Sequence, residues 1–360
     1  MKKKPVWLFN FSSSSNGGGF NRTRETVKWF DNNFGAYFII NDKIKDEIII
    51  HNKINKYFFI SENKIKRLLM DGYYLPKIID EIGKPDIYFS YGIPVFKDIA
   101  RINWFHISNA LSLKTKNISI NFVKRIQMWI LKKRIIKSMK YTHIATGESE
   151  FSINLLKDKN NEKHIKCFYD VLPNGHDISL VKNVLNKKRE LSYKYGITIG
   201  TFKYKKIKVA LKLFHEIKKT NNLKKMIVVG SFDHIPKSVV DDKFVEIKSN
   251  VSTKELLNLL YNAEYYISAS QIENSSIAAF EALILSKNLV ISNIPSHEEM
   301  LRNFETKKIF LENSSTEFIV LDIKNKNKNK KFAPISWNDV NRKLFQIIEN
   351  FNNEMLQTYI

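Results

Sequence analysis

The sequence predicts an α/β protein built from two similar domains, each with a parallel sheet covered by helices. Short β-branched and aromatic runs alternate with longer helical patterns, which is typical of parallel sheets. This alternation occurs twice, before and after a sharp turn at Pro173 to Gly175. The 360 residues suffice for two full hydrophobic cores. We therefore expect one domain at residues 1–177, a second at 178–336, and a terminal helix at 337–360 that packs across the domains.

In the first half, apolar runs predict strands and amphipathic stretches between them predict helices. The expected strands are Val6–Phe11, Ala36–Ile40, Tyr57–Ile60, Ile87–Ser90, a strand ending near His106, Tyr141–Thr146 and a strand that ends before Pro173. The expected helices are Thr23–Asn33, Lys64–Ile82, the stretch 121–140 and Glu148–Leu156.

The second half repeats this order. The expected strands are Gly196–Thr201, Lys225–Gly230, Phe244–Ile247, Tyr265–Ser270 and Leu289–Ser292. One helix is expected after Thr201 and a last one from about Trp337. Two others are expected between them, at Ser252–Asn262, which begins with a capping box at Ser252 and Glu255, and at Ile277–Leu285. The low-complexity run KNKNKNKK, Lys324 to Lys331, is expected to be a mobile surface loop.

A glycine-rich segment follows the first expected strand. Gly17, Gly18 and Gly19 stand between that strand and the helix that we expect from Thr23. Strand, glycine-rich loop and helix together form a phosphate-cradling arrangement, because glycine lets the backbone approach a ligand closely. The spacing is not that of a dinucleotide fingerprint, so an NAD site is not supported. A flexible surface loop is the alternative interpretation.

The second half contains a helix with an unusual charge. Ile277 to Leu285 is apolar except for Glu281, so this carboxylate must find a partner in a largely buried helix. Asn274, Ser275 and Ser276 supply N-cap chemistry before the helix, and Glu273 stands at the same strand-to-helix turn. Such a turn at the carboxyl end of a strand is where anionic ligands bind.

This stretch resembles the signature of retaining glycosyltransferases of family 4. The resemblance rests on Glu273 and Glu281 with seven residues between them, on the EAL that begins at Glu281, and on the later IPSHEE. It implies the GT-B fold, in which two Rossmann-like domains face each other across a cleft. It also implies that Glu281 holds the ribose hydroxyls of a nucleotide-sugar and that Glu273 lies beside the donor sugar. Two unrelated glutamates on an ordinary βαβ unit are the alternative.

Two further segments extend the resemblance. The sequence PNGHD, which begins at Pro173, is similar to the turn that ends the family's N-terminal domain, so Asn174 and Gly175 are expected at the hinge. Family members place a histidine near the donor sugar at a point comparable to His106, which we take as a candidate catalytic residue. A core histidine bonded to the backbone is an equal alternative for His106.

The diphosphate-binding loop departs from the family pattern. Gly200 is followed by Thr201, where family members usually have arginine, and Lys205 and Lys206 stand in range of the family's lysine. If one cation is missing, Lys206, or Lys205 if the loop is one residue shorter, must carry more of the leaving-group charge. A solvated lysine run is the alternative. The helix after Glu281 also ends atypically, because Ser286 and Asn288 replace the family's usual glycine and proline.

The charge distribution indicates an anionic partner. Lys+Arg of 59 against Asp+Glu of 36 gives a net charge of +23, and no acid occurs between Ile99 and Gly147. Within that stretch, Lys114 to Lys140 mixes basic and large apolar residues as interfacial membrane segments do. We therefore expect contact with an anionic membrane surface. A solvated basic helix is the alternative.

Several classes of function are not supported. The single cysteine, Cys167, cannot form an internal disulfide, which favours the cytoplasm. The apolar stretch Val6 to Phe9 is too short for a signal peptide, and no apolar run is long enough to span a membrane. No Asp-x-Asp occurs, so a metal-held diphosphate is not suggested, and no cofactor is expected beside the donor.

These observations predict a retaining, metal-independent hexosyltransferase peripheral to the inner membrane face. Its donor would be a nucleoside-diphosphate sugar, and its acceptor a glycan or a lipid-linked unit of surface polysaccharide such as O-antigen or capsule. A sugar-nucleotide epimerase of the same fold is one rival. A basic nucleic-acid-binding protein is another, although no nucleic-acid module is recognised and no nucleic-acid partner is expected. A degenerate, inactive transferase is a third. The sequence does not indicate the oligomeric state.

Overall fold

The computed structural model describes residues 4–49, 54–61, 73–161, 166–189, 193–311, 316–323 and 334–357. The chain forms two compact units, which are described separately here. The first comprises Met1–Thr115, Ile126–Gly175 and Ile335–Ile360. The second comprises the short segment Lys116–Arg125 and His176–Pro334. The main passage from one unit to the other thus falls between Gly175 and His176.

The first unit contains a seven-stranded parallel sheet with the order β3-β2-β1-β4-β5-β6-β7. Its central strands are buried on both faces, as their continuous apolar sequences require. The strands are β1 (Trp7–Phe11), β2 (Tyr37–Asn41), β3 (Lys56–Ile60), β4 (Ile87–Tyr91), β5 (Ile102–Ile107), β6 (Ile144–Gly147) and β7 (Phe168–Val171).

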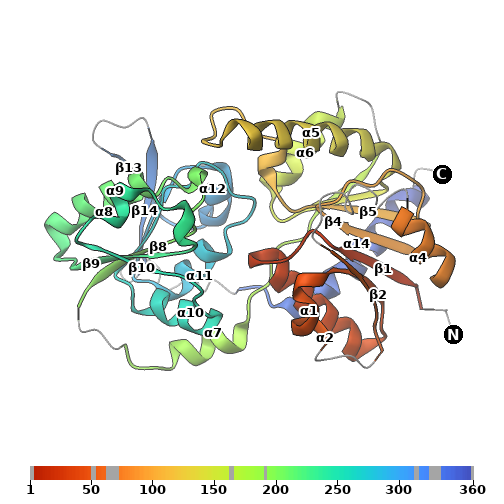
Figure 1. Ribbon diagram of the computed structural model, residues 1–360, viewed down its shortest axis with the longest axis horizontal. Helices are drawn as coiled ribbons and strands as arrows, with labels where there is room; N and C mark the ends of the chain where they lie inside the picture. The colour runs from red at the N-terminus through yellow and green to blue at the C-terminus, as the bar shows by residue number, and fades with distance from the viewer. Residues whose placement is uncertain are drawn as a thin grey trace. The chain divides into compact units, whose positions relative to one another are not determined.

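Helices cover both faces of this first sheet (Figure 1). On one face, α1 and α14 pack over an aromatic cluster around Phe9 and Phe30. On the other face, α4 covers Leu8, while α5 and α6 cover Phe105. The helices are α1 (Gly17–Asn33), α2 (Lys45–Ile49), α4 (Leu75–Ile82), α5 (Phe122–Ser138), α6 (Glu150–Asn161) and α14 (Trp337–Gln357). The short 3₁₀ helices are η1 (Asp42–Ile44), η3 (Ala110–Ser112) and η4 (Met139–Tyr141).

The second unit contains a seven-stranded sheet with the order β10-β9-β8-β11-β12-β14-β13. The strands from β10 to β12 are parallel, and β14 and β13 add an antiparallel edge. The strands are β8 (Tyr195–Ile199), β9 (Lys225–Val229), β10 (Val245–Lys248), β11 (Tyr265–Ser268), β12 (Asn288–Ser292), β13 (Lys307–Phe310) and β14 (Glu317–Asp322).

Two groups of helices complete the second unit (Figure 1). One core joins the sheet to α7, α10, α11 and α12, and the other joins it to α8 and α9. The helices are α7 (Ile178–Leu185), α8 (Ile207–Asn221), α9 (Lys237–Val240), α10 (Thr253–Asn262), α11 (Ile277–Leu285) and α12 (Pro295–Leu301). The short 3₁₀ helices are η5 (Lys203–Lys205) and η6 (Phe232–His234).

The predicted fold class, α/β with two sheets dominated by parallel strands, is confirmed. Three expected elements had wrong boundaries. The helix α1 begins at Gly17 and not near Thr23, β6 begins at Ile144 and not at Tyr141, and α6 covers Glu150–Asn161 and not Glu148–Leu156. Of the helix expected over Lys64–Ile82, the structure describes α4, and residues 62–72 lie outside the described part. The run Lys324 to Lys331 also lies outside the described residues.

Candidate functional site

The candidate donor residues lie where the second sheet reverses its strand order. The strand β8 is adjacent to β11, and the strands that follow β8 in the chain lie on its other side. The loops at the carboxyl ends of two such strands diverge, and ligands of α/β sheets bind there. The loop after β8 carries Lys205 and Lys206, and the loop after β11 carries Glu273.

An ion pair joins these two loops. Nζ of Lys205 donates a hydrogen bond to Oε1 of Glu273, and the two side chains are only 18% and 12% exposed. Burial by itself would raise the pKa of the Glu273 carboxyl, but the charge of Lys205 and other hydrogen-bonding groups outweigh burial, so the pKa falls below its ordinary value. Glu273 is therefore a carboxylate at neutral pH, and Lys205 neutralises it.

Lys206 has a different environment. It stands at the start of α8 with a left-handed backbone (φ 52°, ψ 49°), which is uncommon for a lysine. Its carbonyl accepts hydrogen bonds from the N–H groups of Val209 and Ala210, so the strained backbone is part of the helix start. The structure pairs its ammonium group with no acid among the described residues. Lys206 is thus a cation of this loop that remains available for an anion, and the exposed Lys203 also has no ion pair among the described residues.

The two residues before this lysine segment shape the loop. Gly200 has φ +93°, a conformation that favours glycine, and its N–H donates to the carbonyl of Val229 at 2.8 Å. The Thr201 side chain is buried and packs so closely against Gly230 that a Cβ on that glycine would lie 2.6 Å from Cγ2 of Thr201. Thr201 is therefore a packing residue, which accounts for the missing cation at this position.

The helix α11 covers the predicted range and carries an isolated carboxylate. Oγ of Ser276 accepts a hydrogen bond from the N–H of Ala279 at 3.3 Å, so Ser276 caps the helix, with Asn274 and Ser275 just before it. Burial raises the pKa of Glu281 to about 7. Within the described part of the chain, no group donates a hydrogen bond to this carboxylate. Glu281 thus retains its full capacity to accept hydrogen bonds from a ligand.

The atypical end of α11 needs no glycine. Ser286 has φ −78° and ψ 167°, which any residue adopts, and its hydroxyl donates to the carbonyl of Leu260 at 3.0 Å. The side-chain amide of Asn288 donates to the carbonyl of Glu264 at 3.0 Å. Both replacements are therefore stabilised by their own hydrogen bonds, and the helix that holds Glu281 keeps its geometry.

The first turn of α12 adds a histidine that the sequence analysis did not single out. His297 is 1% exposed, and its Nδ1 lies 2.8 Å from the carbonyl oxygen of Ser292. Burial lowers the pKa of this imidazole although Glu273 opposes the effect, so His297 is neutral. Oγ of Ser292 in turn donates to the carbonyl of Ser270 at 2.5 Å. A histidine soon after a buried strand, in IPSHEE, was the available signal.

In the first unit, the glycine-rich segment is not a loop. Gly17, Gly18 and Gly19 form the first turn of α1, so the expected cradle is a helix N-terminus. A Cβ on Gly19 would lie 3.1 Å from Oγ of Ser14 and 3.4 Å from Cε1 of Tyr91, which explains why a small residue stands there. N–H groups in the first turn of a helix have no partner within it and attract anions.

A buried arginine in the same helix was not singled out from the sequence. Nη2 of Arg22 donates to the carbonyls of Leu172 and Pro173, at 3.2 and 2.8 Å, and to Oδ1 of Asn174 at 3.1 Å. Arg22 is 2% exposed. It fixes the chain just before the first unit ends, so the residues expected to form the hinge are held by a guanidinium group. A lone arginine in a polar segment gave no sequence signal of this role.

The expected hinge residues are closely packed on the first-unit side. Asn174 is 6% exposed and binds Arg22. A Cβ on Gly175 would lie 2.6 Å from Cδ2 and 2.8 Å from Cα of Trp337, the first residue of α14. Only glycine fits against the start of the terminal helix at this position.

His106 is a core residue of the first sheet. It is fully buried on β5, its ring stacks on Tyr91 with centroids 5.1 Å apart, and Nδ1 lies 2.9 Å from the hydroxyl oxygen of Thr146. Burial, with a smaller contribution from Arg22, lowers its pKa well below the ordinary value. His106 is therefore neutral and bonded to a side-chain hydroxyl. Its expected role beside a donor sugar stays a prediction.

The basic helix α5 exposes large apolar side chains. Met128 and Ile135 face the core. The exposed apolar residues, which we call the α5 apolar surface, are Phe122 (75%), Val123 (63%), Ile126 (43%), Trp129 (58%) and Ile130 (47%). Basic residues lie among them, and Nζ of Lys133 stands 5.5 Å from the ring centroid of Trp129. An exposed apolar surface bordered by cations is typical of an interaction site.

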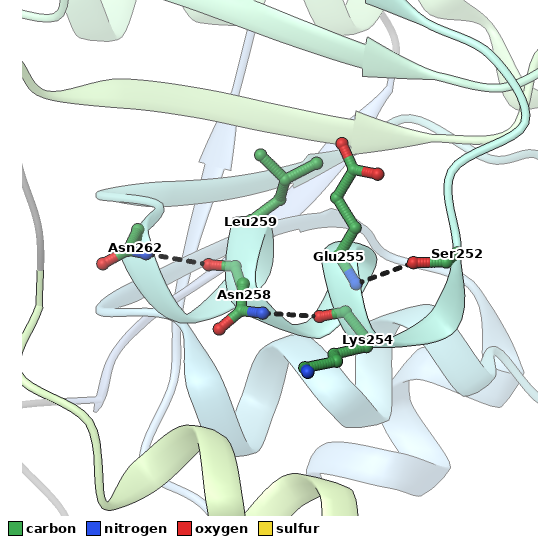
Figure 2. Close-up of a pocket in the computed structure, with 6 residues that line it drawn as sticks. All are labelled: Ser252, Lys254, Glu255, Asn258, Leu259 and Asn262. Atoms are coloured by element: carbon green, nitrogen blue, oxygen red, sulfur yellow. Dashed lines mark hydrogen bonds between the residues drawn. The ribbon is translucent and has the colours of Figure 1, made fainter.

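A hollow of about 290 Å³ lies along α10, and several of its polar groups form hydrogen bonds within the helix and its cap, although Oδ1 of Asn262 has no partner in the described part of the chain (Figure 2). Oγ of Ser252 caps the N–H of Glu255 at 3.2 Å, and the amide of Asn258 donates to the carbonyl of Lys254 at 2.8 Å. All lining residues come from this one helix and its cap, and none comes from the loops after β8 or β11. The hollow is therefore not the candidate donor site.

The described residues contain neither a membrane-spanning helix nor a cluster of metal ligands. No helix in the described ranges is long and apolar enough to cross a membrane. Within the same ranges, no group of three or more histidine, cysteine, aspartate or glutamate side chains is placed to hold a metal ion.

Comparison with known proteins agrees with the fold. Residues 182–333 match the model of the family glycosyl transferases group 1. No curated protein sequence matches the chain. Among solved structures, the N-terminal domain of Candida albicans trehalose-6-phosphate phosphatase gives a TM-score of 0.64 at 10% identity, over 97% of this chain and 98% of that chain.

Two other neighbours were solved with nucleotide ligands. HepE of Anabaena, in complex with UDP and glucose, gives a TM-score of 0.57 at 12% identity, over 97% of this chain and 91% of that chain. An E. coli structure described as trehalose-6-phosphate bound with UDP-2-fluoro glucose gives a TM-score of 0.57 at 9% identity, over 82% of this chain and 86% of that chain. At such low identity these likenesses establish the architecture alone. The chain therefore has the two-sheet GT-B fold, and its second unit matches the glycosyl transferases group 1 model.

Proposed function

We propose that the chain is a retaining glycosyltransferase that moves a sugar from a nucleoside-diphosphate sugar to an acceptor hydroxyl without a metal ion. The observation that carries the proposal is the set of charged groups after β8 and β11. Lys206 and the Glu273–Lys205 pair lie on the two loops, and Glu281, to which no described group donates a hydrogen bond, lies on α11, the helix that follows the second loop. The match of residues 182–333 to glycosyl transferases group 1 supports it. So do the UDP-containing complexes of two structural neighbours.

The second unit would bind the donor nucleotide. Glu281 accepts hydrogen bonds from the two ribose hydroxyls, since a carboxylate can accept from vicinal donors. The N–H groups at Asn274, Ser275 and Ser276 and the ammonium of Lys206 bind the diphosphate, because a helix N-terminus and a cation both stabilise negative charge. Lys205 is already paired with Glu273, so Lys206 is the better candidate for the phosphates.

The reaction exchanges one bond at the anomeric carbon of the sugar. The bond from this carbon to the phosphate oxygen breaks with oxocarbenium character, and the acceptor oxygen bonds to the same face. The acceptor proton passes to the departing diphosphate, so no protein nucleophile is required. Lys206 and the α11 N–H groups stabilise the charge that develops on the diphosphate. The Glu273 carboxylate, whose charge Lys205 partly offsets, lies beside the sugar ring and contributes to stabilising the positive charge that develops there.

The acceptor is proposed to be a lipid-linked glycan of a surface polysaccharide, bound by the first unit at an anionic leaflet. The α5 apolar surface inserts among the lipid headgroups, and the surrounding lysines and arginines contact anionic lipid. Each basic residue near such a surface contributes ~1 kcal/mol. The absence of any acid between Ile99 and Gly147 favours this partner.

The first experiment tests the reaction. The protein is incubated with UDP-, GDP- and ADP-linked hexoses without acceptor, and the slow release of nucleoside diphosphate and of free sugar is followed by NMR. The proposal predicts that one donor is hydrolysed with the anomeric configuration of the first-formed sugar retained. An inverted sugar would contradict the retaining mechanism, and an epimerised nucleotide-sugar would favour an epimerase.

A second experiment tests the membrane partner. Sedimentation with phosphatidylglycerol vesicles at low and high salt should show binding that salt weakens, whereas neutral phosphatidylcholine vesicles should bind weakly. The Phe122→Ser/Trp129→Ser variant should bind the anionic vesicles tenfold or more weakly. The variant no longer gains the free energy of moving two aromatic side chains out of water. Ile309→Ser, on the exposed strand β13, is the matched control. Binding to oligonucleotides instead of vesicles would contradict the proposal.

A further inference from the structure

The turn after β12 and the first turn of α12 carry buried polar atoms that the described part of the protein leaves unsatisfied. Oδ1 of Asn293, Oγ of Ser296 and Nε2 of His297 have no hydrogen-bond partner in the described part of the chain. A buried polar atom without a partner costs about 1–3 kcal/mol. Three such atoms between Asn293 and His297 point to a ligand that supplies the missing bonds.

The chemistry of His297 specifies what the ligand must offer. Nδ1 lies 2.8 Å from the carbonyl oxygen of Ser292, and a carbonyl can only accept, so Nδ1 carries the proton. In the neutral ring, Nε2 is then a bare acceptor. The side chain is 1% exposed, so solvent does not satisfy it. The missing partner is therefore a hydrogen-bond donor.

The surroundings place His297 near the loop that carries Glu273. The Ser292 carbonyl fixes the His297 ring, and the Ser292 hydroxyl donates to the carbonyl of Ser270 at 2.5 Å, which ties the loop after β12 to the loop after β11. Glu273 on that second loop and its partner Lys205 both act electrostatically on His297. His297 thus adjoins the carboxylate that we assign to the sugar.

We propose that Nε2 of His297 accepts a hydrogen bond from a hydroxyl group of the transferred sugar, so that His297 helps to select the donor sugar. This inference rests on the proposed function. A diphosphate is excluded as the partner because its ionised oxygens only accept hydrogen bonds. The ribose hydroxyls are assigned to Glu281, which leaves the sugar hydroxyls as the most abundant donors in the ligand.

Calorimetry on the full chain separates sugar binding from nucleotide binding. The probes are UDP, GDP and ADP, each compared with UDP-glucose, GDP-mannose and ADP-glucose. For the base that binds, the measured quantity is the dissociation constant of the nucleotide-sugar divided by that of the nucleoside diphosphate. In His297→Ala, the nucleotide-sugar should bind ~3–10-fold more weakly while the nucleoside diphosphate binds as before, as expected for one lost hydrogen bond.

Two further variants control the measurement. His297→Gln fills the site and offers an amide oxygen as acceptor, so it should recover part of the sugar affinity, and it serves if the alanine variant does not fold. His215→Ala removes a histidine of α8 that pairs with Asp242 at 2.8 Å, and it should leave the ratio unchanged.

The outcomes distinguish this inference from the proposed function. An unchanged ratio in both His297 variants, or an equal loss for nucleotide and nucleotide-sugar, would overturn the role of His297 and leave the transferase proposal intact. Wild-type protein that binds none of the nucleotides would overturn both.

Discussion

Replacing Glu281 by glutamine should make the second unit more stable at alkaline pH while it abolishes the proposed ribose contact. Burial raises the pKa of Glu281 to about 7 from an ordinary value of 4.5. Because the folded protein holds the proton more tightly than the unfolded chain does, the stabilising contribution is complete below pH 4.5. It is lost as the pH rises through 7. Above that pH the wild type carries a largely desolvated carboxylate to which no described residue donates a hydrogen bond.

The magnitude follows from the two pKa values, which differ by about 2.5 pH units, or ~3 kcal/mol. Glutamine has no such penalty. The stability advantage of Glu281→Gln should therefore be about 1 kcal/mol at pH 5 and about 3 kcal/mol at pH 8. For a domain of this size, this corresponds to a rise of ~6–12 °C in the thermal midpoint at pH 8.

Calorimetry or far-UV circular dichroism at pH 5 and pH 8 measures this change. Tryptophan fluorescence cannot replace them, because every tryptophan belongs to the first unit: Trp7, Trp29, Trp104, Trp129 and Trp337. Glu273→Gln is the matched control, and it should change the free energy of unfolding in the opposite direction. It leaves the largely buried Lys205 without its partner, so it should destabilise the second unit at neutral pH. An advantage of Glu281→Gln that does not grow between pH 5 and pH 8 would refute the reasoning.

Three other changes test the structure and the site. Ser286→Gly should lower the free energy of unfolding of the second unit by about 1–2 kcal/mol, measured by urea denaturation. It gives the unfolded backbone more freedom and removes the hydrogen bond from the hydroxyl to the carbonyl of Leu260. A gain in stability would show that glycine is preferred there. Arg22→Leu leaves buried carbonyls unsatisfied and should lower the tryptophan-monitored midpoint of the first unit, and an unchanged midpoint would contradict this. Lys206→Ala should weaken nucleoside-diphosphate binding about tenfold or more, measured by calorimetry. Lys203→Ala is the control and should leave the affinity unchanged. Equal losses of affinity in both variants would favour a general contribution of positive charge.

The elements of the sheet and the helix α11 could be predicted because their signals are local. Ile277 to Leu285 is a continuous apolar run preceded by a capping serine, and the helix covers that range. The start of α1 could not be predicted, because glycine disfavours helices. It is decided by tertiary packing, since Gly19 lies too close to Ser14 and Tyr91 for a side chain.

The candidate site was only partly visible in the sequence. The spacing of Glu273 and Glu281 identified two carboxylates. It could not show that Lys205 pairs with one, or that the other has no hydrogen-bond donor among the described residues. His297 was missed because its significance depends on Ser292 fixing one ring nitrogen and on burial isolating the other. Long-range pairing and burial of this kind leave no periodic pattern in a single sequence.

Binding of a panel of nucleoside diphosphates, measured by calorimetry at pH 8 with wild type and Glu281→Ala, tests the central claim most directly. One nucleotide should bind to the wild type and bind at least ~10-fold more weakly to the variant, since two hydrogen bonds to a charged acceptor are lost. Glu255→Ala, on the exposed face of α10, should bind like the wild type. A folded wild-type protein that binds none of the nucleotides would contradict the account.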